Sequence, residues 1–262
     1  MTNPNGTTSK LAIPEAKYAA APAGPCTGPP EADRNDKPPH VRFQTIAAAE
    51  SQRVCESHLR AIMTADDEFG ATMQLLADKG VLDNTIVIFS SDNGYFWGEH
   101  SRIEKFMAYD PSVRVPLWIR WPGHFGAGIN STRQVSQLDL LPTLMEAAGA
   151  TRPAGAPVLD GESLLSPSGR STMFAEYFLD TANGNTATWK MVRTPTVKYI
   201  QTYAPSGTVN FKEYYDLATD PAENINLLKD GNAANDPSAS ELSALMATLN
   251  TLATCAGSAC VR

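Results

Sequence analysis

The longest regular pattern in the chain is an apolar stripe that runs through residues 43–79. Its members recur at steps of three and four: Val54, Leu59, Ile62, Met63, Phe69, Met73 and Leu76. This spacing predicts one long amphipathic helix. Lys79 and Gly80 suit its end, because a cation favours the last turn and glycine the cap. Two shorter helices are predicted over residues 139–148, with Asp139 near the start, and over residues 238–254.

A different pattern follows the long helix. Residues 85–91, TIVIFSS, are β-branched and apolar on both faces, which predicts a buried, parallel, central strand. The polar stretch SDNG comes directly after it, and residues 116–121, PLWIRW, predict a second short strand. A helix, a buried strand and then a polar loop are typical of an open α/β sheet, in which ligands gather at the carboxyl ends of strands.

The last third of the chain has a third character. Beyond residue 170 it contains short alternating segments rich in aromatic residues, MFAEYF, TWKMVRT, KYIQTY and KEYYDL, which predict a small antiparallel sheet. Residues 1–40 hold 8 of the 19 prolines and read as extended chain. We therefore divide the sequence into an extended segment, 1–36, a partial α/β domain, 37–168, and a C-terminal α+β subdomain, 169–262.

Composition narrows the class of protein. The chain has 262 residues, of which 42% are hydrophobic, enough for a sizeable core. Acidic residues outnumber basic ones by 28 to 21, and the net charge of −7 argues against a nucleic-acid or anionic-membrane partner. No apolar run is long enough to span a bilayer, and the N-terminus lacks the pattern of a signal peptide. Cys255 and Cys260 are close enough for a disulfide, although two free thiols fit the spacing equally well.

Candidate chemistry lies where the predicted central strand ends. Asp92 and Asn93 place two oxygen ligands on adjacent residues, which suits Ca²⁺ or Mg²⁺ better than zinc. The same Asp-Asn-Gly sequence is also a common tight turn, so the local pattern leaves both interpretations open.

The surrounding residues are more specific. DNTIVIFSSDNGYFWGEHSRIEKFMAYDPSVRVPLWIRWPG closely resembles the calcium-dependent sulfatase family of the alkaline-phosphatase-like superfamily. QLDLLPTLMEAAGA, DGESLL, KEYYDLATDPAENINLL and CAGSACVR extend the resemblance toward N-acetylglucosamine-6-sulfatase-like and arylsulfatase-like members, from about residue 36 to the end. The resemblance implies a partial large α/β sheet domain of the alkaline-phosphatase-like sulfatase fold, with a small C-terminal antiparallel sheet and a packed helix.

The resemblance also implies roles for four residues. Asp92 and Asn93 match two calcium ligands, and Lys105, thirteen residues after Asp92, matches the lysine that contacts the substrate sulfate. A fixed ammonium and a divalent cation would both stabilise the negative sulfate oxygens. His100 lies in the same substrate-binding stretch, where a supporting or packing role is the simpler expectation. A solvated surface lysine is the alternative for Lys105.

The sequence departs from the family pattern in two places. It contains no Asp-Asp pair after a first strand, and neither Cys-x-Pro-x-Arg nor its Ser variant, the motif whose first residue becomes the formylglycine nucleophile in the family. Asp66 and Asp67 lie within the long helix, and Cys26 lacks the required arginine. His40 aligns with a later tryptophan position of the family, so we expect a surface or packing role. His58 and His124 have no evident partners in the sequence.

These observations predict a portion of a sulfatase with half of a calcium site, a sulfate-binding lysine and no nucleophile. We expect this chain to be inactive alone. We also expect it to associate or aggregate in solution, because an uncovered sheet edge favours association. A phosphate or phosphonate ester hydrolase of the same superfamily, or a non-catalytic binding protein with this fold, are the alternatives. The family is usually secreted, periplasmic or lysosomal; the sequence leaves the compartment, the particular sulfate ester and the oligomeric state open.

Overall fold

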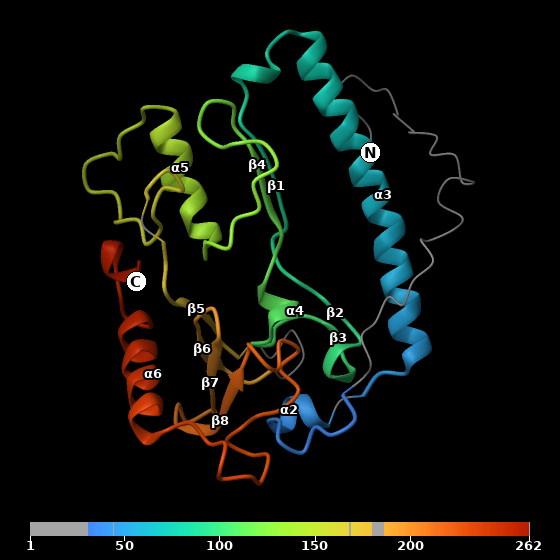
Figure 1. Cartoon of the computed structure of the whole chain (residues 1–262), viewed down its shortest axis with the longest axis vertical. Helices are drawn as coiled ribbons and strands as arrows, with labels where there is room; N and C mark the ends of the chain where they lie inside the picture. Colours follow the sequence, from blue (N-terminus) through green and yellow to red (C-terminus); the bar gives the residue numbers. More distant parts are fainter. Residues whose placement is uncertain (1–30, 44, 168, 180–185, 262) are drawn as a thin grey trace.

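The computed structural model describes residues 31–43, 45–167, 169–179 and 186–261. Most of the predicted extended segment, residues 1–30 with Cys26, lies outside these ranges. In Figure 1 the long helix α3 stands on one side, a two-stranded sheet lies at the centre, and a four-stranded sheet lies below it. The helices are α2 (Pro39–Arg42), α3 (Ala48–Asp78), α4 (Asp110–Val113), α5 (Leu140–Ala147) and α6 (Ala239–Leu252), with short 3₁₀ turns at Leu82–Asn84, Glu99–Ser101, Gln137–Asp139 and Gly257–Cys260.

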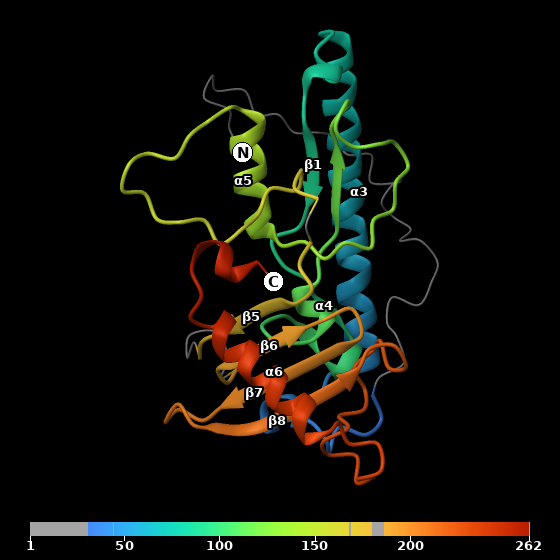
Figure 2. The same cartoon turned by 60° about the vertical axis from the view of Figure 1, so that its left-hand side comes forward.

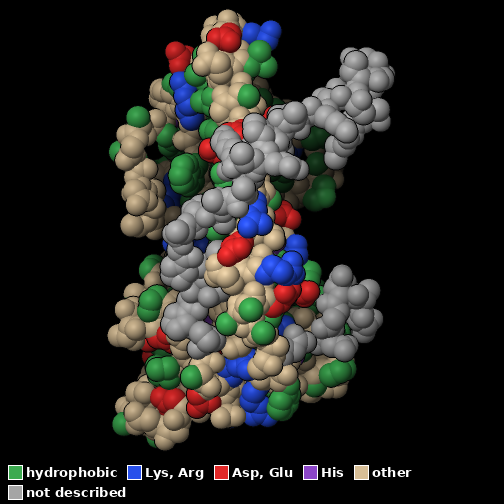
Figure 3. Space-filling model, turned by 90° about the vertical axis from the view of Figure 1, so that its right-hand side faces the viewer, with side chains coloured by type: hydrophobic (Ala, Val, Ile, Leu, Met, Phe, Trp, Pro, Cys, Tyr) green, Lys and Arg blue, Asp and Glu red, His purple; other side chains and the backbone are tan. Residues whose placement is uncertain are grey.

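The helix α3 confirms the prediction from the apolar stripe, although its stripe is only partly covered. Phe69 packs edge-on against Phe89 with ring centroids 5.8 Å apart. Ile62 of the stripe is more than half exposed, as is Leu75 outside it, and Ser51 and Cys55 are the buried residues of the helix. On the side that faces the viewer in Figure 3, acidic and basic side chains are interspersed along the molecule, without a large patch of one sign.

The predicted central strand exists as β1 (Val87–Ser90), but its expected pairing is wrong. It pairs antiparallel with β4 (Leu117–Arg120), with Phe89 opposite Trp118. Within the described ranges, β1 and β4 form a sheet of two strands, and β1 is half-buried. An apolar run reports that a strand has two sheltered faces, but it does not specify which strand lies beside it.

The C-terminal sheet confirms the alternation in the sequence. It contains β5 (Met173–Tyr177), β6 (Trp189–Arg193), β7 (Val197–Tyr203) and β8 (Val209–Asp216), paired antiparallel in chain order. Helix α6 lies across one face of this sheet, as Figure 2 shows, where Leu249 and Leu252 pack with Val192 and Tyr199. The predicted final helix is therefore confirmed.

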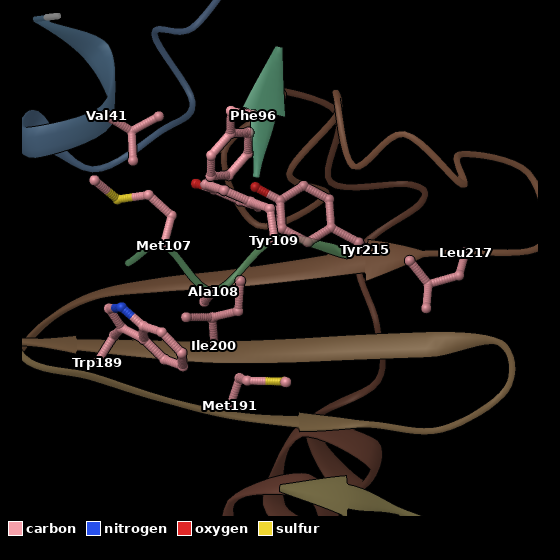
Figure 4. Packing of buried hydrophobic residues seen from close by; sticks show 10 residues of the cluster. All are labelled: Val41, Phe96, Met107, Ala108, Tyr109, Trp189, Met191, Ile200, Tyr215 and Leu217. Carbon is pink, nitrogen blue, oxygen red and sulfur yellow. The ribbon is translucent and has the colours of Figure 1, made fainter. Parts of the chain in front are cut away.

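The opposite face of the same sheet carries the main hydrophobic core. Met107, Ala108 and Tyr109 come from the segment between α4 and a small hairpin of β2 (Phe96–Trp97) and β3 (Ile103–Glu104). They lie over the strands of the C-terminal sheet in Figure 4. The sheet, with the residue directly after β8, contributes Trp189, Met191, Ile200, Tyr215 and Leu217. Phe96 and Val41 from other parts of the chain complete the cluster. The segment that follows Lys105 is thus buried against the C-terminal sheet.

The end of the chain is fixed by a disulfide and a buried ion pair. Cys255 and Cys260 are bonded, which settles the choice that their spacing left open. Arg170 donates to the Cys260 carbonyl at 2.6 Å and to Asp139 Oδ1 at 2.5 Å. Asp139 closes a capping box with Ser136 before α5, which places it at the predicted helix start. Cys55 also belongs to a disulfide.

Candidate functional site

The loop after β1 holds its shape through local hydrogen bonds and one close backbone approach. Ser91 Oγ donates to the Asn93 carbonyl at 2.8 Å, and the Asn93 N–H donates to Asp92 Oδ1 at 2.9 Å. The Gly94 N–H donates to the Ser112 carbonyl at 2.9 Å. A side chain at Gly94 would place its Cβ 2.0 Å from the Pro111 carbonyl oxygen, so this position excludes any larger residue. The loop is therefore fixed against α4.

Two of the predicted site residues meet directly. Lys105 Nζ donates to Asn93 Oδ1 at 2.7 Å, which joins the end of the β2–β3 hairpin to the end of β1. The hairpin consists of β2 (Phe96–Trp97) and β3 (Ile103–Glu104). The ammonium also lies 5.6 Å from the centroid of the Phe106 ring, a favourable position for a cation. Lys105 is half-buried and oriented rather than a freely solvated surface lysine.

Asp92 lies beside this pair with an exposed side chain. Its backbone carbonyl and that of Ser91 face the Gln137 side-chain amide, which donates to Ser91. Gln137 belongs to the 3₁₀ turn before α5, so this helix also supports the loop. Sequence reasoning did not single out Gln137, since a lone glutamine at a helix start carries no chemical signal of its own.

His100 lies in a different environment from Lys105. Its side chain is buried, and Nδ1 is 2.7 Å from Glu31 Oε2. Its ring packs 4.3 Å from that of Tyr109, centroid to centroid, and its backbone adopts a φ of +50°. Glu31 is paired in turn with buried Lys37 at 2.9 Å. These contacts suit a supporting role, and direct substrate contact by His100 stays a prediction.

The other histidines have partners that the sequence did not reveal. His58 Nδ1 accepts the indole N–H of Trp97 at 2.9 Å, and the His124 ring lies 4.2 Å from that of Trp121. His40 packs near Arg102, whose guanidinium donates to the His40 carbonyl. Burial, with a smaller contribution from Arg102, lowers the pKa of His40 to about 4, so this imidazole is neutral at pH 7.

A buried group of charges lies between this region and the C-terminal sheet. Asp110 accepts from Lys198 at 2.6 Å and from Arg193 at 3.0 Å, and Lys198 also pairs with Glu223. Burial alone would raise the pKa of Asp110, but Lys198 and Arg193 outweigh it and lower this pKa. Sequence reasoning missed these residues, because charged positions in alternating strands are typical of a solvent-facing side.

A cleft of about 710 Å³ adjoins this charged group. His100, Asp110, Arg114 and Trp118 contribute to its walls. Asn93 and Lys105 do not line it, so the cleft and the Lys105–Asn93 pair are separate features.

The residues present fit a calcium site only in part. The Asp92 carboxylate and the Asn93 amide are hard oxygen donors of the kind that Ca²⁺ prefers, but Ca²⁺ takes six to eight such ligands. In the part of the chain that the structure describes, no group of three or more His, Cys, Asp or Glu side chains could hold a metal ion. The described residues thus offer a pair of ligands, with Lys105 beside them.

The fold and this pair point to the alkaline-phosphatase-like hydrolases. The solved structure of a protein in complex with its substrate D-glucosamine-2-N,6-O-disulfate matches 78% of this chain and 41% of its own, with a TM-score of 0.68 and 28% identity. The phosphonate monoester hydrolase of Agrobacterium radiobacter matches 79% of this chain and 42% of its own, with a TM-score of 0.64 and 28% identity.

Sequence comparison gives the family. The Sulfatase family model matches residues 21–150, and the model for the C-terminal part of N-sulphoglucosamine sulphohydrolase matches residues 98–250. The chain belongs to the sulfatase family. It is 30% identical to an N-acetylglucosamine-6-O-sulfatase of Bacteroides thetaiotaomicron over 193 residues, which is 71% of this chain and 34% of that protein.

The relatives are much longer than this chain. An arylsulfatase of Volvox carteri is 30% identical over 263 residues, which covers 88% of this chain and 39% of the relative. The chain therefore spans roughly a third to two fifths of these two curated relatives. Among the described residues, no helix is long and apolar enough to cross a membrane.

Proposed function

We propose that this chain forms part of a sulfatase that hydrolyses sulfate esters of sugar or aryl compounds. In this proposal Asp92 and Asn93 are two of the calcium ligands, and Lys105 contacts the sulfate group. The observation that carries the proposal is the 2.7 Å contact between Lys105 Nζ and Asn93 Oδ1 at the end of β1. This contact brings a fixed positive charge to one of the two proposed calcium ligands, and Asp92, the other, is its neighbour along the chain. A positive charge at this place would stabilise the sulfate oxygens.

Each residue has a defined task in this proposal. The Lys105 ammonium would neutralise negative charge on the sulfate oxygens and hold the group at one position. The Asn93 amide oxygen would orient that ammonium, and the Ser91, Gly94 and Gln137 hydrogen bonds would keep the loop in place. A bound calcium ion would supply Lewis-acid stabilisation of the same oxygens.

The chain alone is expected to be catalytically inactive. Its sequence contains neither Cys-x-Pro-x-Arg nor the Ser variant of this motif, to which the family resemblance assigns the nucleophile. Positioning and charge stabilisation without an attacking group bind a substrate but do not cleave it. Incubation of the purified chain with p-nitrophenyl sulfate and CaCl₂ should release no p-nitrophenol above the buffer rate. Release of the product would contradict the assignment of an absent nucleophile.

Binding tests the proposed site directly. Addition of CaCl₂ should shift the backbone amide NMR signals of residues 91–94 with weak, roughly millimolar affinity, because two protein ligands are few for this ion. Asp92→Ala and Asn93→Ala should abolish these shifts, and Asp66→Ala, on the exposed side of α3, should not. Sodium sulfate should shift the backbone amide signals of residues 104–106, and these shifts should disappear in Lys105→Ala but persist in Lys79→Ala. Shifts that survive Asp92→Ala and Asn93→Ala would refute the calcium assignment.

A phosphonate or phosphate ester hydrolase is the second candidate. The similarity to the Agrobacterium radiobacter phosphonate monoester hydrolase, at 28% identity, supports this alternative function. Methyl phenylphosphonate and phenyl sulfate, titrated separately against the Lys105 signals, discriminate the two. Tighter binding of the sulfate ester supports the sulfatase proposal, and tighter binding of the phosphonate ester supports the alternative.

A further inference from the structure

The backbone is unusual on both sides of Lys105. Glu104 has a φ of +80° and Phe106 a φ of +78°, in the left-handed region that residues with a Cβ rarely adopt. Neither residue is glycine, so each conformation must be held by surrounding contacts. The contacts that hold these two backbone conformations therefore also determine the position of Lys105 between them.

On the N-terminal side the β-hairpin supplies the constraint. Glu104 lies opposite Phe96, and Ile103 lies opposite Trp97, in the pairing of β2 with β3. This fixes the chain up to Glu104. It does not reach past Lys105, so the orientation of Phe106 depends on other contacts.

On the C-terminal side the constraint comes from the distant strand β6. The indole Nε1 of Trp189 donates to the Phe106 carbonyl oxygen at 2.7 Å. The Phe106 ring lies 5.5 Å from the Tyr177 ring, which stacks on Trp189 with centroids 6.2 Å apart. Trp189 is only 4% exposed and belongs to the main core (Figure 4), so its N–H has a fixed direction.

Further anchors follow Phe106, but they lie farther from Lys105. The Ala108 carbonyl accepts from Lys198, and the Asp110 N–H donates to Glu223. Of the side chains described as bonding this segment from the C-terminal sheet, Trp189 reaches the residue adjacent to Lys105. This hydrogen bond can therefore fix the position of the Lys105 backbone, from which the side chain extends.

We propose that Trp189 is a positioning residue: its indole N–H holds the turn at Glu104–Phe106 and thereby directs Lys105 toward Asn93. The consequence for sulfate binding rests on the function proposed above for Lys105. The C-terminal sheet then contributes to the site without touching the substrate.

The test uses Trp189→Phe, which keeps an aromatic ring in the core but removes the donor. Trp97→Phe is the matched control, because it also removes one partly buried indole hydrogen bond, to His58, and Trp97 lies on the β2–β3 hairpin that carries Glu104. NMR of the Lys105 ε-methylene group measures the orientation of the side chain in the absence of any ligand. We expect two distinct, ordered ε-proton signals in the wild type and in Trp97→Phe, and averaged signals in Trp189→Phe. Unchanged Lys105 signals in Trp189→Phe would overturn the proposal.

Sulfate affinity provides the second readout. Trp189→Phe should weaken sodium sulfate binding about tenfold, comparable to the loss of one hydrogen bond. In a Lys105→Ala background the same change should have no further effect, because a positioning residue acts through the lysine. An equal loss in both backgrounds would overturn the inference. If Lys105→Ala leaves sulfate binding unchanged, the proposed function fails instead, and the ε-methylene signals still decide the role of Trp189.

Discussion

The carboxyl group of Glu213 should make the stability of this protein decrease as the pH rises toward 8. Glu213 is buried in the C-terminal sheet, where its Oε1 accepts from the hydroxyls of Tyr109 at 2.6 Å and Tyr215 at 2.7 Å. Burial raises its pKa from 4.5 to about 7, and the two tyrosine hydrogen bonds oppose this only in part. The folded state therefore retains a proton that the unfolded state releases.

The sign and size of the effect follow from these two pKa values. Below about pH 4.5 the group is protonated in both states, and its contribution to stability is fully present. As the pH rises through 7, the folded state must ionise a buried carboxyl, and the contribution is lost. Between pH 5 and pH 8 the free energy of unfolding should fall by roughly 2–3 kcal/mol from this group.

Urea denaturation of the wild type and of Glu213→Gln, at pH values from 5 to 8, measures this contribution. The amide keeps an oxygen that accepts from both tyrosines but does not titrate, so the variant should lack the decrease in stability between about pH 4.5 and pH 7. Glu241→Gln is the control, because Glu241 also accepts from a tyrosine hydroxyl, that of Tyr214, but is exposed. Other titrating groups are common to all three proteins and cancel in the comparison. Equal pH dependence in the wild type and Glu213→Gln would refute the reasoning.

Two further substitutions test the packing around the site. Gly94→Ala should destabilise the fold by about 1–3 kcal/mol, because the new Cβ would meet the Pro111 carbonyl oxygen at 2.0 Å. The control Gly70→Ala, which has open space around it in α3, should be neutral or stabilising. Wild-type stability of Gly94→Ala in urea denaturation would contradict the close approach. Asp139→Asn should cost about 3–5 kcal/mol, since it leaves buried Arg170 without its ionic partner. Asp83→Asn, which breaks an exposed pair with Arg120, should change stability by at most about 1 kcal/mol, and equal losses in these two variants would refute the argument from burial.

The sequence predicted the elements better than their partners. The apolar period of α3 and the aromatic alternation of β5–β8 are local properties, and both predictions are confirmed. The antiparallel partner of β1 was not predictable from VIFS. A strand that is apolar throughout does not specify which strand pairs with it, in which direction or in which register. The pairing of His58 with Trp97 was hidden for the same reason, since 39 residues separate them.

Only those residues of the candidate site that belong to a recognisable sequence motif could be predicted. Asp92, Asn93 and Lys105 were identified from spacing and family resemblance, and Asn93 and Lys105 are in contact. Gln137 and Trp189 were not, because each acts through a hydrogen bond to a backbone carbonyl, which any residue can offer. Supporting residues of this kind become visible only when the chain is folded.

The buried charges show why sequence alternation misleads in the C-terminal sheet. Lys198 and Glu213 alternate with Tyr199 and Tyr214 along their strands, which normally indicates one wet and one dry face. Here α6 covers the face of Tyr199, and residues 107–109 cover the face of Lys198 and Ile200.

A charged face can be buried in this way only if the covering segment supplies partners. Lys198 donates to the Ala108 carbonyl and to Asp110, and Glu213 accepts from Tyr109. Every one of these partners lies within five residues of Lys105 along the chain. The polar side chains of the sheet therefore form hydrogen bonds and an ion pair with the backbone and side chains of that one segment. Replacing the segment by an apolar one of equal volume would leave Lys198 with Glu223 and Glu213 with Tyr215, and would remove their other partners. The stability of the sheet therefore depends on the loop that carries Lys105.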